Sequence, residues 1–314
     1  MEAGHLPVMP DEVIATLAPA AGGLQIDATV GGGGHTERIL EAASPDGRVL
    51  GLDADQAAID RVGPRLARFG DRLVLRRANF RELASVAPAA GFGAVDGLFF
   101  DLGLSSFQLA DRDRGFGFRA GGPLDMRFDT NRGVPAAELL ETLDADALAA
   151  LFRRYGEEPA AWKIAKAVVA ARATAPVGTA EDLALLVERV VPVNPRLRRR
   201  THPATRVFQA LRIAVNEELD ALEEGLLAAV DLLRPGGRLV VLSYHSLEDR
   251  IVKRFLAAER RGCVCPPAAP VCVCGRAPRL RLVTRPSLTP TEAEVDANPR
   301  ARSARLRAAE RLAA

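Results

Sequence analysis

Short apolar runs recur through the first third of the chain and again before its C-terminal quarter, and most of them end in an acidic or polar residue. A strand covered on both faces of a parallel sheet is almost continuously apolar, because neither face meets water. We therefore predict an α/β fold in which buried parallel strands alternate with helices. The predicted strands cover residues 24–27, 48–53, 73–80, 94–101 and 238–243, with a late edge strand at 280–284.

An unusually long connection separates two of these strands. The strand ending at Asp101 is followed by residues 102–237 before the next predicted strand begins, far more than one helical crossover needs. Apolar positions recur at helical spacing within this connection, and Thr179 is a suitable N-cap for one of its helices. The helical segments are residues 135–155, 158–174 and 180–191, and further helices over 206–233 are expected to rejoin the core. The predicted domains are core residues 1–107, an all-helical insert at 108–205, and core residues 206–314 with a basic C-terminal tail.

Four consecutive glycines, residues 31–34, lie between the first predicted strand and a predicted helix. Such a turn lets the backbone approach a ligand closely and directs free helix N–H groups at it. The dinucleotide fingerprint GxGxxG fails here, because Thr36 or Glu37 occupies the place of its third glycine. The spacing from Asp27 to the glycines is closer to the S-adenosylmethionine (SAM) turn of Rossmann-like methyltransferases, although Thr29 stands where that turn often has a glycine. A glycine-rich loop without a ligand is the alternative.

The ends of further strands carry side chains of the kind that an adenosine ligand needs. Asp53, about 20 residues past the glycines, can accept hydrogen bonds from both ribose hydroxyls. Asn79 and Phe80 suit the amino edge and the face of an adenine ring, and Asp101 ends a buried run followed by LGLSS. Each residue alone is equally well explained as a cap or turn residue. Because parallel strands bring their carboxyl ends to one edge of a sheet, the set together favours a nucleotide-like cofactor.

Composition is that of an ordinary globular protein, with 48% hydrophobic and 26% charged residues. We find neither a secretion leader nor an apolar run long enough for a membrane span, so we expect a cytoplasmic protein. The net charge of +2 conceals an asymmetry, because residues 250–314 hold 14 Lys and Arg against 5 Asp and Glu. A second basic segment, 195–206, has no acid and contains Arg196, Arg198, Arg199, Arg200 and Arg206. Both segments are candidates for phosphate contacts, with a solvated charged surface as the alternative.

The four cysteines form two CVC pairs, Cys263 with Cys265 and Cys272 with Cys274. Paired thiols this close in sequence are candidate zinc ligands, but structural sites usually space each pair as CxxC or wider. A proline-rich surface loop is the alternative interpretation. We therefore expect no metal in this segment.

Long sequence blocks spread over nearly the whole chain are more specific than any glycine motif. In these blocks the chain resembles the bacterial small-subunit (16S) rRNA cytosine N4-methyltransferases. The blocks include HLPVMPDEV at 5–13, DATVGGGGHTERIL at 27–40, FFDLGLSSFQL at 99–109, RGFGFRAGGPLDMR at 114–127, HPATRVFQALRIAVNEEL at 202–219, SYHSLEDRIVKRF at 243–255 and NPRARSARLRAAER at 298–311. The resemblance implies a Rossmann-like class I SAM-dependent methyltransferase sheet with an inserted all-helical domain that recognises RNA.

The resemblance also implies a cofactor, a substrate and site residues. SAM is the implied cofactor, and the implied reaction methylates N4 of a cytidine in the decoding region of 16S rRNA, with the 30S subunit as partner. The implied cofactor contacts are Gly33, Gly34, His35, Asp53, Phe80, Asp101 and Gln108. The candidates for substrate contact are Ser105, Ser106, His245, Arg198, Arg199 and Arg200.

The chemistry of an exocyclic amine narrows the catalytic candidates. N4 of cytosine is a poor nucleophile, because its lone pair is delocalised into the ring, so an acceptor must take a hydrogen bond from N4–H as the nitrogen rehybridises. Asp101, at the start of DLGLSS, is our candidate for that role, while His245 is equally well explained as a hydrogen-bonded structural residue. Two other functions remain open: an amino-methyltransferase for another nucleic acid or for protein, and a non-catalytic ribosome-assembly factor.

Overall fold

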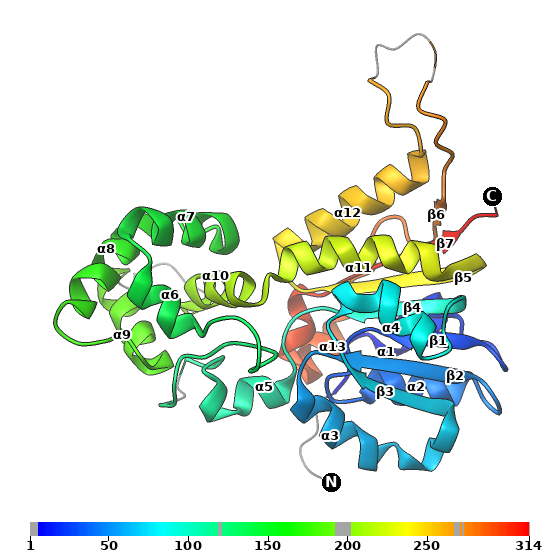
Figure 1. Cartoon of the computed structure of the whole chain (residues 1–314), viewed down its shortest axis with the longest axis horizontal. Coiled ribbons are helices and arrows are strands. Elements are labelled where there is room, and N and C mark those ends of the chain that lie inside the picture. Colours follow the sequence, from blue (N-terminus) through cyan, green and yellow to red (C-terminus); the bar gives the residue numbers. More distant parts are fainter. Residues whose placement is uncertain (1–5, 119–120, 192–201, 267–270, 272, 314) are drawn as a thin grey trace. The chain divides into compact units, whose positions relative to one another are not determined.

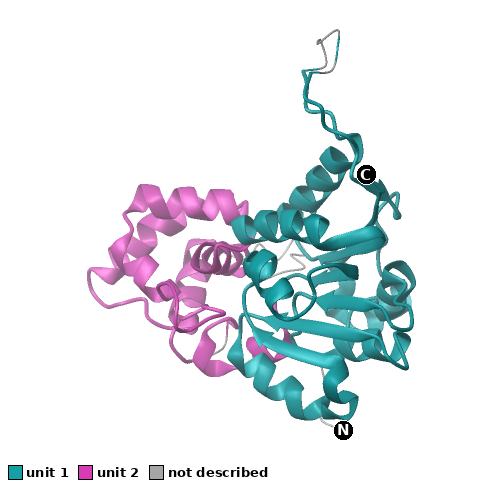
Figure 2. Cartoon of the chain, turned by 45° about the vertical axis from the view of Figure 1, so that its right-hand side comes forward, with its two compact units in different colours: residues 1–103, 219–314 teal, residues 104–218 magenta. Residues whose placement is uncertain are grey.

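The computed structural model describes residues 6–118, 121–191, 202–266, 271 and 273–313. The chain forms two compact units (Figure 2). Unit 1 comprises Met1–Gly103 and Leu219–Ala314, and unit 2 comprises Leu104–Glu218. An insertion after the fourth strand therefore folds as a unit of its own.

Unit 1 is built on a seven-stranded sheet in the order β3-β2-β1-β4-β5-β7-β6. The strands are β1 (Leu24–Asp27), β2 (Arg48–Asp53), β3 (Leu73–Arg77), β4 (Val95–Asp101), β5 (Leu233–Ser243), β6 (Leu280–Leu282) and β7 (Arg305–Arg311). The first five strands are parallel to one another, whereas β7 runs antiparallel to both of its neighbours. This order confirms the predicted Rossmann-like α/β fold. Successive strands are added on one side of β1 up to β3 and on the other side from β4 onward, and open α/β sheets bind their ligands at such a switch point, here between β1 and β4.

Helices cover both faces of this sheet (Figure 1). One face packs against α4 (Leu83–Ala89), α11 (Glu218–Leu232) and α12 (Ser246–Arg261), and the other against α1 (Pro10–Leu17) and α2 (Gly34–Ala42). Phe100 belongs to the first core and Phe99 to the second, because successive side chains of a strand point to opposite faces. The remaining helical elements of unit 1 are α3 (Gln56–Arg65), η1 (Ala67–Arg72), η2 (Phe80–Glu82), α13 (Glu292–Ala297) and η4 (Pro299–Ser303).

The last strand, β7, corrects the prediction of a basic C-terminal tail. It lies between β5 and β6 in the sheet, with Leu306 and Ala308 buried. Arg307 forms an ion pair with Asp249 of α12, at 2.7 Å from Nε to Oδ1. Glu310 forms ion pairs with two arginines of neighbouring strands, Arg238 and Arg281. The sequence analysis missed this strand because charged residues alternate with its small apolar ones.

Unit 2 is helical around a core of its own. Its helices are α5 (Ser106–Ala110), η3 (Arg112–Arg114), α6 (Ala136–Thr142), α7 (Ala145–Gly156), α8 (Ala161–Arg172), α9 (Ala180–Val190) and α10 (Thr205–Asn216). Thr179 caps α9 as predicted, accepting a hydrogen bond from the Asp182 N–H at 3.1 Å. Helix α10 packs into this core through Val207 and Leu211. The unit therefore runs beyond the predicted boundary at residue 205 and includes a helix that we had expected in the core of unit 1.

Within the part of the chain that the structure describes, none of the helices combines the length and the apolar character that crossing a lipid bilayer requires.

Candidate active site

The glycine turn joins β1 to α2 and depends on glycine for its shape. Gly33, the residue before α2, has φ +77°, in the left-handed region that favours glycine. A Cβ on Gly33 would lie 3.0 Å from the side chain of Val62, and one on Gly34 would lie 3.3 Å from Pro7. The turn is therefore packed closely on both sides, and the first N–H groups of α2 are held at the edge of the sheet.

Asp27, the last residue of β1, stabilises this turn through two hydrogen bonds. Its Oδ2 accepts a hydrogen bond from the Thr36 hydroxyl at 2.6 Å, and its Oδ1 accepts one from the Thr29 N–H at 3.1 Å. The side chain is fully buried, and burial raises its pKa to about 6. The sequence analysis noted this acid but gave it no role; a threonine nine residues after it, one turn into the helix, was the available signal.

Asp53, at the end of β2, faces the same turn. Its Oδ2 accepts a hydrogen bond from the Gly31 N–H at 2.8 Å, and its Oδ1 accepts one from the Asp55 N–H at 2.9 Å. Burial raises the pKa of Asp53 to about 6. An ionised carboxylate offers about four acceptor positions, so two hydrogen bonds to the backbone leave room for the hydroxyls of a ribose.

Beyond β3, Asn79 and Phe80 lie at the start of the short helix η2. Asn79 caps it, its Oδ1 accepting a hydrogen bond from the Arg81 N–H at 3.0 Å. Phe80 is partly buried and packs edge to face on Phe100, with ring centroids 5.6 Å apart. The cap interpretation of Asn79 is thus confirmed, and contact with adenine stays a prediction for both residues.

Asp101, at the end of β4, is the centre of a hydrogen-bonded group. The Tyr244 hydroxyl donates to its Oδ1 at 2.6 Å, and His35 Nε2 lies 3.5 Å from its Oδ2. Its backbone N–H donates to the Thr29 hydroxyl at 2.6 Å. Tyr244 follows β5 directly, so three neighbouring strands supply this group: β1, β4 and β5. The sequence analysis predicted a strand ending at residue 243 but gave no role to Tyr244, the residue that follows it.

The protonation of Asp101 is strongly perturbed. Burial raises the pKa of Asp101 to about 7; the hydrogen bond from Tyr244 opposes the rise, and the charges of Asp27 and Glu248 add to it. Burial and the charge of Asp101 in turn raise the pKa of Tyr244 well above its ordinary value, so its hydroxyl remains a donor at neutral pH. A carboxyl group that titrates near pH 7 can take up or release a proton under working conditions.

Three predicted site residues belong to unit 2. Ser105 is the N-cap of α5: its hydroxyl accepts a hydrogen bond from the Gln108 N–H at 3.2 Å, and the Gln108 Oε1 accepts one from the Ser105 N–H at 3.0 Å. Ser106 is the first residue of that helix. Ser105 and Gln108 thus have a structural role as a reciprocal cap. Contact with cofactor or substrate stays a prediction for all three residues.

His245 has a structural role at the N-terminus of α12. Its Nδ1 accepts a hydrogen bond from the Glu248 N–H at 3.4 Å, and its Nε2 lies 3.1 Å from Oε1 of the same buried glutamate. The structural interpretation of His245 is therefore confirmed, while a substrate contact stays a prediction. Three other candidates for substrate contact, Arg198, Arg199 and Arg200, lie outside the described residues.

Comparison with known proteins identifies the family. The model of the MraW methylase family matches residues 2–312, nearly the whole chain. The chain belongs to the MraW methylase family. It is 57% identical to the "Ribosomal RNA small subunit methyltransferase H" of Thermomicrobium roseum over 309 residues, 98% of this chain and 94% of that protein. It is 50% identical to the protein of that name from Syntrophotalea carbinolica, over 98% of both chains, and 49% identical to that from Carboxydothermus hydrogenoformans, over 99% of both.

The methyl donor implied for a methylase of this fold is SAM, as predicted from the glycine turn. The site has acidic acceptor groups that suit such a ligand. Three acids end adjacent strands, Asp27, Asp53 and Asp101, and burial raises the pKa of each to about 6 or 7. Burial makes the negative charge of these acids costly, and a ligand with a sulfonium and an ammonium group would favour their ionised forms.

Proposed function

We propose that this protein transfers a methyl group from SAM to N4 of a cytidine in the decoding region of 16S rRNA, on the 30S subunit. Membership of a methylase family and relatives called small-subunit rRNA methyltransferases support an rRNA substrate. The observation that carries the chemistry is the pair formed by Asp101 and Tyr244 at the carboxyl edge of β4 and β5.

Asp101 is the group that handles the proton of N4. When bound, SAM supplies an electrophilic methyl group on its sulfonium. The hydrogen bond from Tyr244 occupies Oδ1 of Asp101 and orients the carboxyl group. Oδ2, which lies 3.5 Å from His35 Nε2, has a second lone pair that can accept a hydrogen bond from N4–H. The raised pKa of Asp101, about 7, gives the carboxylate an affinity for a proton that an exposed aspartate lacks. A hydrogen bond from N4–H to Asp101 increases the electron density on the nitrogen as the nitrogen attacks the methyl group. The same carboxylate can then accept the N4 proton.

Tyr244 and His35 position this carboxyl group. The backbone of Tyr244 is fixed by Glu248, because the Tyr244 N–H donates a hydrogen bond to Oε2 of Glu248 at 2.8 Å. His35 is buried and stacks at a tilt on Phe99, with ring centroids 4.8 Å apart. Side chains fixed in this way keep the reacting oxygen of Asp101 in place and limit the entropy that must be lost on reaction.

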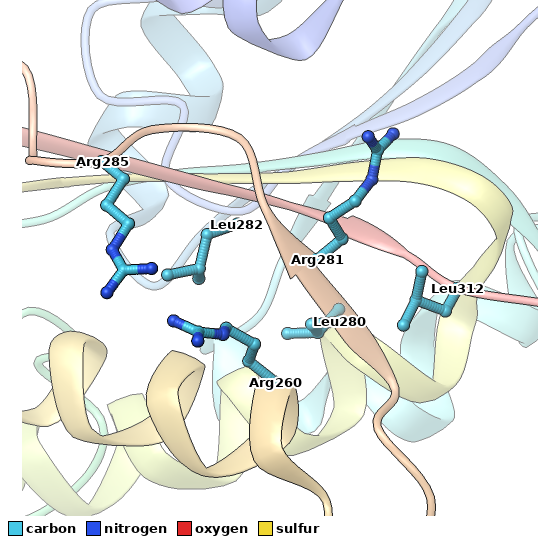
Figure 3. Close-up of a pocket in the computed structure, with 6 residues that line it drawn as sticks. All are labelled: Arg260, Leu280, Arg281, Leu282, Arg285 and Leu312. Carbon is cyan, nitrogen blue, oxygen red and sulfur yellow. The ribbon is translucent and has the colours of Figure 1, made fainter.

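A pocket in unit 1 offers a surface for the RNA backbone. Figure 3 shows three leucines, Leu280, Leu282 and Leu312, with the guanidinium groups of three arginines around them. These arginines are Arg260 of α12, Arg281 of β6 and Arg285 just after β6, and all three are exposed. Arg281 also forms an ion pair with Glu310, at 2.7 Å from Nη2 to Oε1. Because Glu310 partly neutralises its charge, Arg281 should attract a phosphate less strongly than Arg260 and Arg285 do. Phosphate contacts of this kind position an RNA without reading its sequence.

Methylation of purified 30S subunits tests the proposal. Subunits from a strain that lacks the enzyme are incubated with the protein and SAM, and the digested rRNA is examined by mass spectrometry. We expect N4-methylcytidine in a decoding-region fragment with the native protein. The Asp101→Asn variant, which keeps an acceptor for Tyr244, should be slower by about 10²-fold to 10⁴-fold. A methyl group on C5, on a ribose or on adenine would contradict the proposal, and binding without methylation would favour an assembly factor.

A further inference from the structure

The segment between α12 and β6 leaves the body of unit 1 as two legs that run beside each other (Figure 1). The legs touch at their base. A Cβ on Gly262 would lie 2.4 Å from the backbone of Ala277 and of Pro278, and the Arg279 N–H donates to the Glu259 carbonyl at 2.9 Å. The chain is therefore drawn together where the segment begins and ends.

Apolar burial does not explain how the legs stay together farther out. Val264 is 56% exposed, Val271 is 70% exposed and Val273 is 86% exposed. Side chains that remain in water contribute little of the roughly 25 cal/mol per Å² that burial provides. A short segment without a hydrophobic core commonly depends on a covalent or metal cross-link.

Three cysteine sulfurs meet where the legs lie together. The sulfurs of Cys263, Cys265 and Cys274 all lie within 4.8 Å of one another, and those of Cys263 and Cys274 are 3.8 Å apart. Sulfurs at two corners of a tetrahedron with Zn–S bonds of about 2.3 Å are about 3.8 Å apart, whereas a disulfide is about 2.05 Å long. The distance between Cys263 and Cys274 therefore matches two ligands of one ion.

The backbone around these sulfurs also suits a metal centre. The Val273 N–H donates to the sulfur of Cys265 at 3.4 Å, the kind of contact that stabilises a ligating thiolate. Gly275 follows Cys274 with φ +64°, so the chain turns sharply just after a ligand position, at a place where a side chain would have open space. Arg261 and Arg276, two residues outside Cys263 and Cys274 in the sequence, are exposed, and Arg276 Nη2 lies 3.6 Å from Glu259 Oε1.

We propose that Cys263, Cys265 and Cys274 bind a zinc ion that holds the two legs together. The CxC spacing led us to expect no metal, but the structure brings both sulfurs of that pair, Cys263 and Cys265, to one side of the chain together with Cys274. Soft thiolates in a compact group select zinc among the divalent ions that prefer tetrahedral geometry. A water molecule or one further side chain would complete the tetrahedron.

Metal analysis of the full-length protein tests this site. The protein is purified without chelators, and its zinc content is measured by mass spectrometry alongside the Cys263→Ser, Cys274→Ser and Val264→Ser variants. We expect one zinc per chain in the native protein and in Val264→Ser, which alters an exposed residue between two ligands, and loss of zinc from both cysteine variants. Replacement of zinc by Co²⁺ in the native protein should produce thiolate-to-cobalt charge-transfer bands and the visible bands of tetrahedral cobalt.

Several outcomes would overturn the site. They are a native protein that retains neither zinc nor cobalt, a zinc content that is the same in both cysteine variants, and an iron–sulfur absorption spectrum in place of zinc. The cobalt spectrum of the native chain decides the matter by itself if the cysteine variants fail to fold. Since SAM binds elsewhere in unit 1, its calorimetric affinity serves to show that the variants are folded.

Discussion

Replacing Asp101 by Asn should stabilise the ligand-free protein, and increasingly so as the pH rises. The pKa of Asp101 is about 7 in the folded protein against an ordinary value of 3.8, because burial penalises its charge. The folded state therefore binds a proton that the unfolded state has already lost between about pH 4 and pH 7, and stability falls as the pH rises through that window. The amide of the variant has no proton to lose in either state, so it escapes this cost.

The magnitude follows from the two pKa values. Each unit of difference corresponds to 1.36 kcal/mol, and the Asp101 contribution changes by about 2 to 3 kcal/mol between pH 5 and pH 8. The difference in unfolding free energy between the variant and the native protein should grow by that amount over the same range. The hydrogen bond from Tyr244 is kept, because an amide oxygen also accepts.

Urea unfolding followed by far-UV circular dichroism measures this difference at each pH, since the single tryptophan, Trp162, lies in unit 2 and does not report on unit 1. Asp11→Asn is the matched control, because the Asp11 side chain is 84% exposed. The control should show no comparable growth. A difference for Asp101→Asn that stays constant from pH 5 to pH 8, or shrinks, would refute the assignment of a raised pKa and with it the case for Asp101 as proton acceptor.

Other predictions concern the cofactor, the positioning tyrosine and the RNA. Asp53→Ala should weaken SAM binding by about 1.5 to 3 kcal/mol in calorimetry, because it removes a charged acceptor, and unchanged affinity would remove Asp53 from the site. The affinity of the native protein for SAM should rise with pH from about 6 to 7.5, because the raised pKa values of the strand-end acids lie in that range and a cationic ligand favours their ionised forms. S-adenosylhomocysteine, which lacks the sulfonium charge, should show a weaker rise. Equal rises for the two ligands would contradict an interaction between these acids and the sulfonium. Tyr244→Phe should lower kcat by about tenfold with little change in KM for SAM and shift the pH profile of kcat, a shift that a merely structural role would not produce. Replacing Arg260, Arg281 and Arg285 should reduce the salt dependence of RNA binding by roughly one unit per lost phosphate contact, and a native slope would contradict a role in RNA binding.

Much of unit 1 was accessible from the sequence because its signals are local. A strand buried on both faces must be apolar throughout, so β1, β2 and β4 are visible as short apolar runs that end in Asp27, Asp53 and Asp101. Within the glycines at 31–34, Gly31 and Gly33 have φ of +52° and +77°, a conformation that other residues adopt less readily. Strands and turns of these kinds can be recognised from the residues within the segment itself, without knowledge of distant contacts.

The tertiary structure decided which distant residues meet. Tyr244 reaches Asp101 only because β5 pairs with β4 in one register, and a shift by one residue would turn that side chain to the other face of the sheet. The same holds for β7, whose small and charged residues form a strand only because β5 and β6 supply partners on both sides. The sulfurs of Cys263 and Cys274 come within 3.8 Å of each other, a contact that neither CVC pair specifies. Periodicity and composition fix what a segment can form, whereas pairing, register and the raised pKa of Asp101 arise from contacts between segments far apart in the chain.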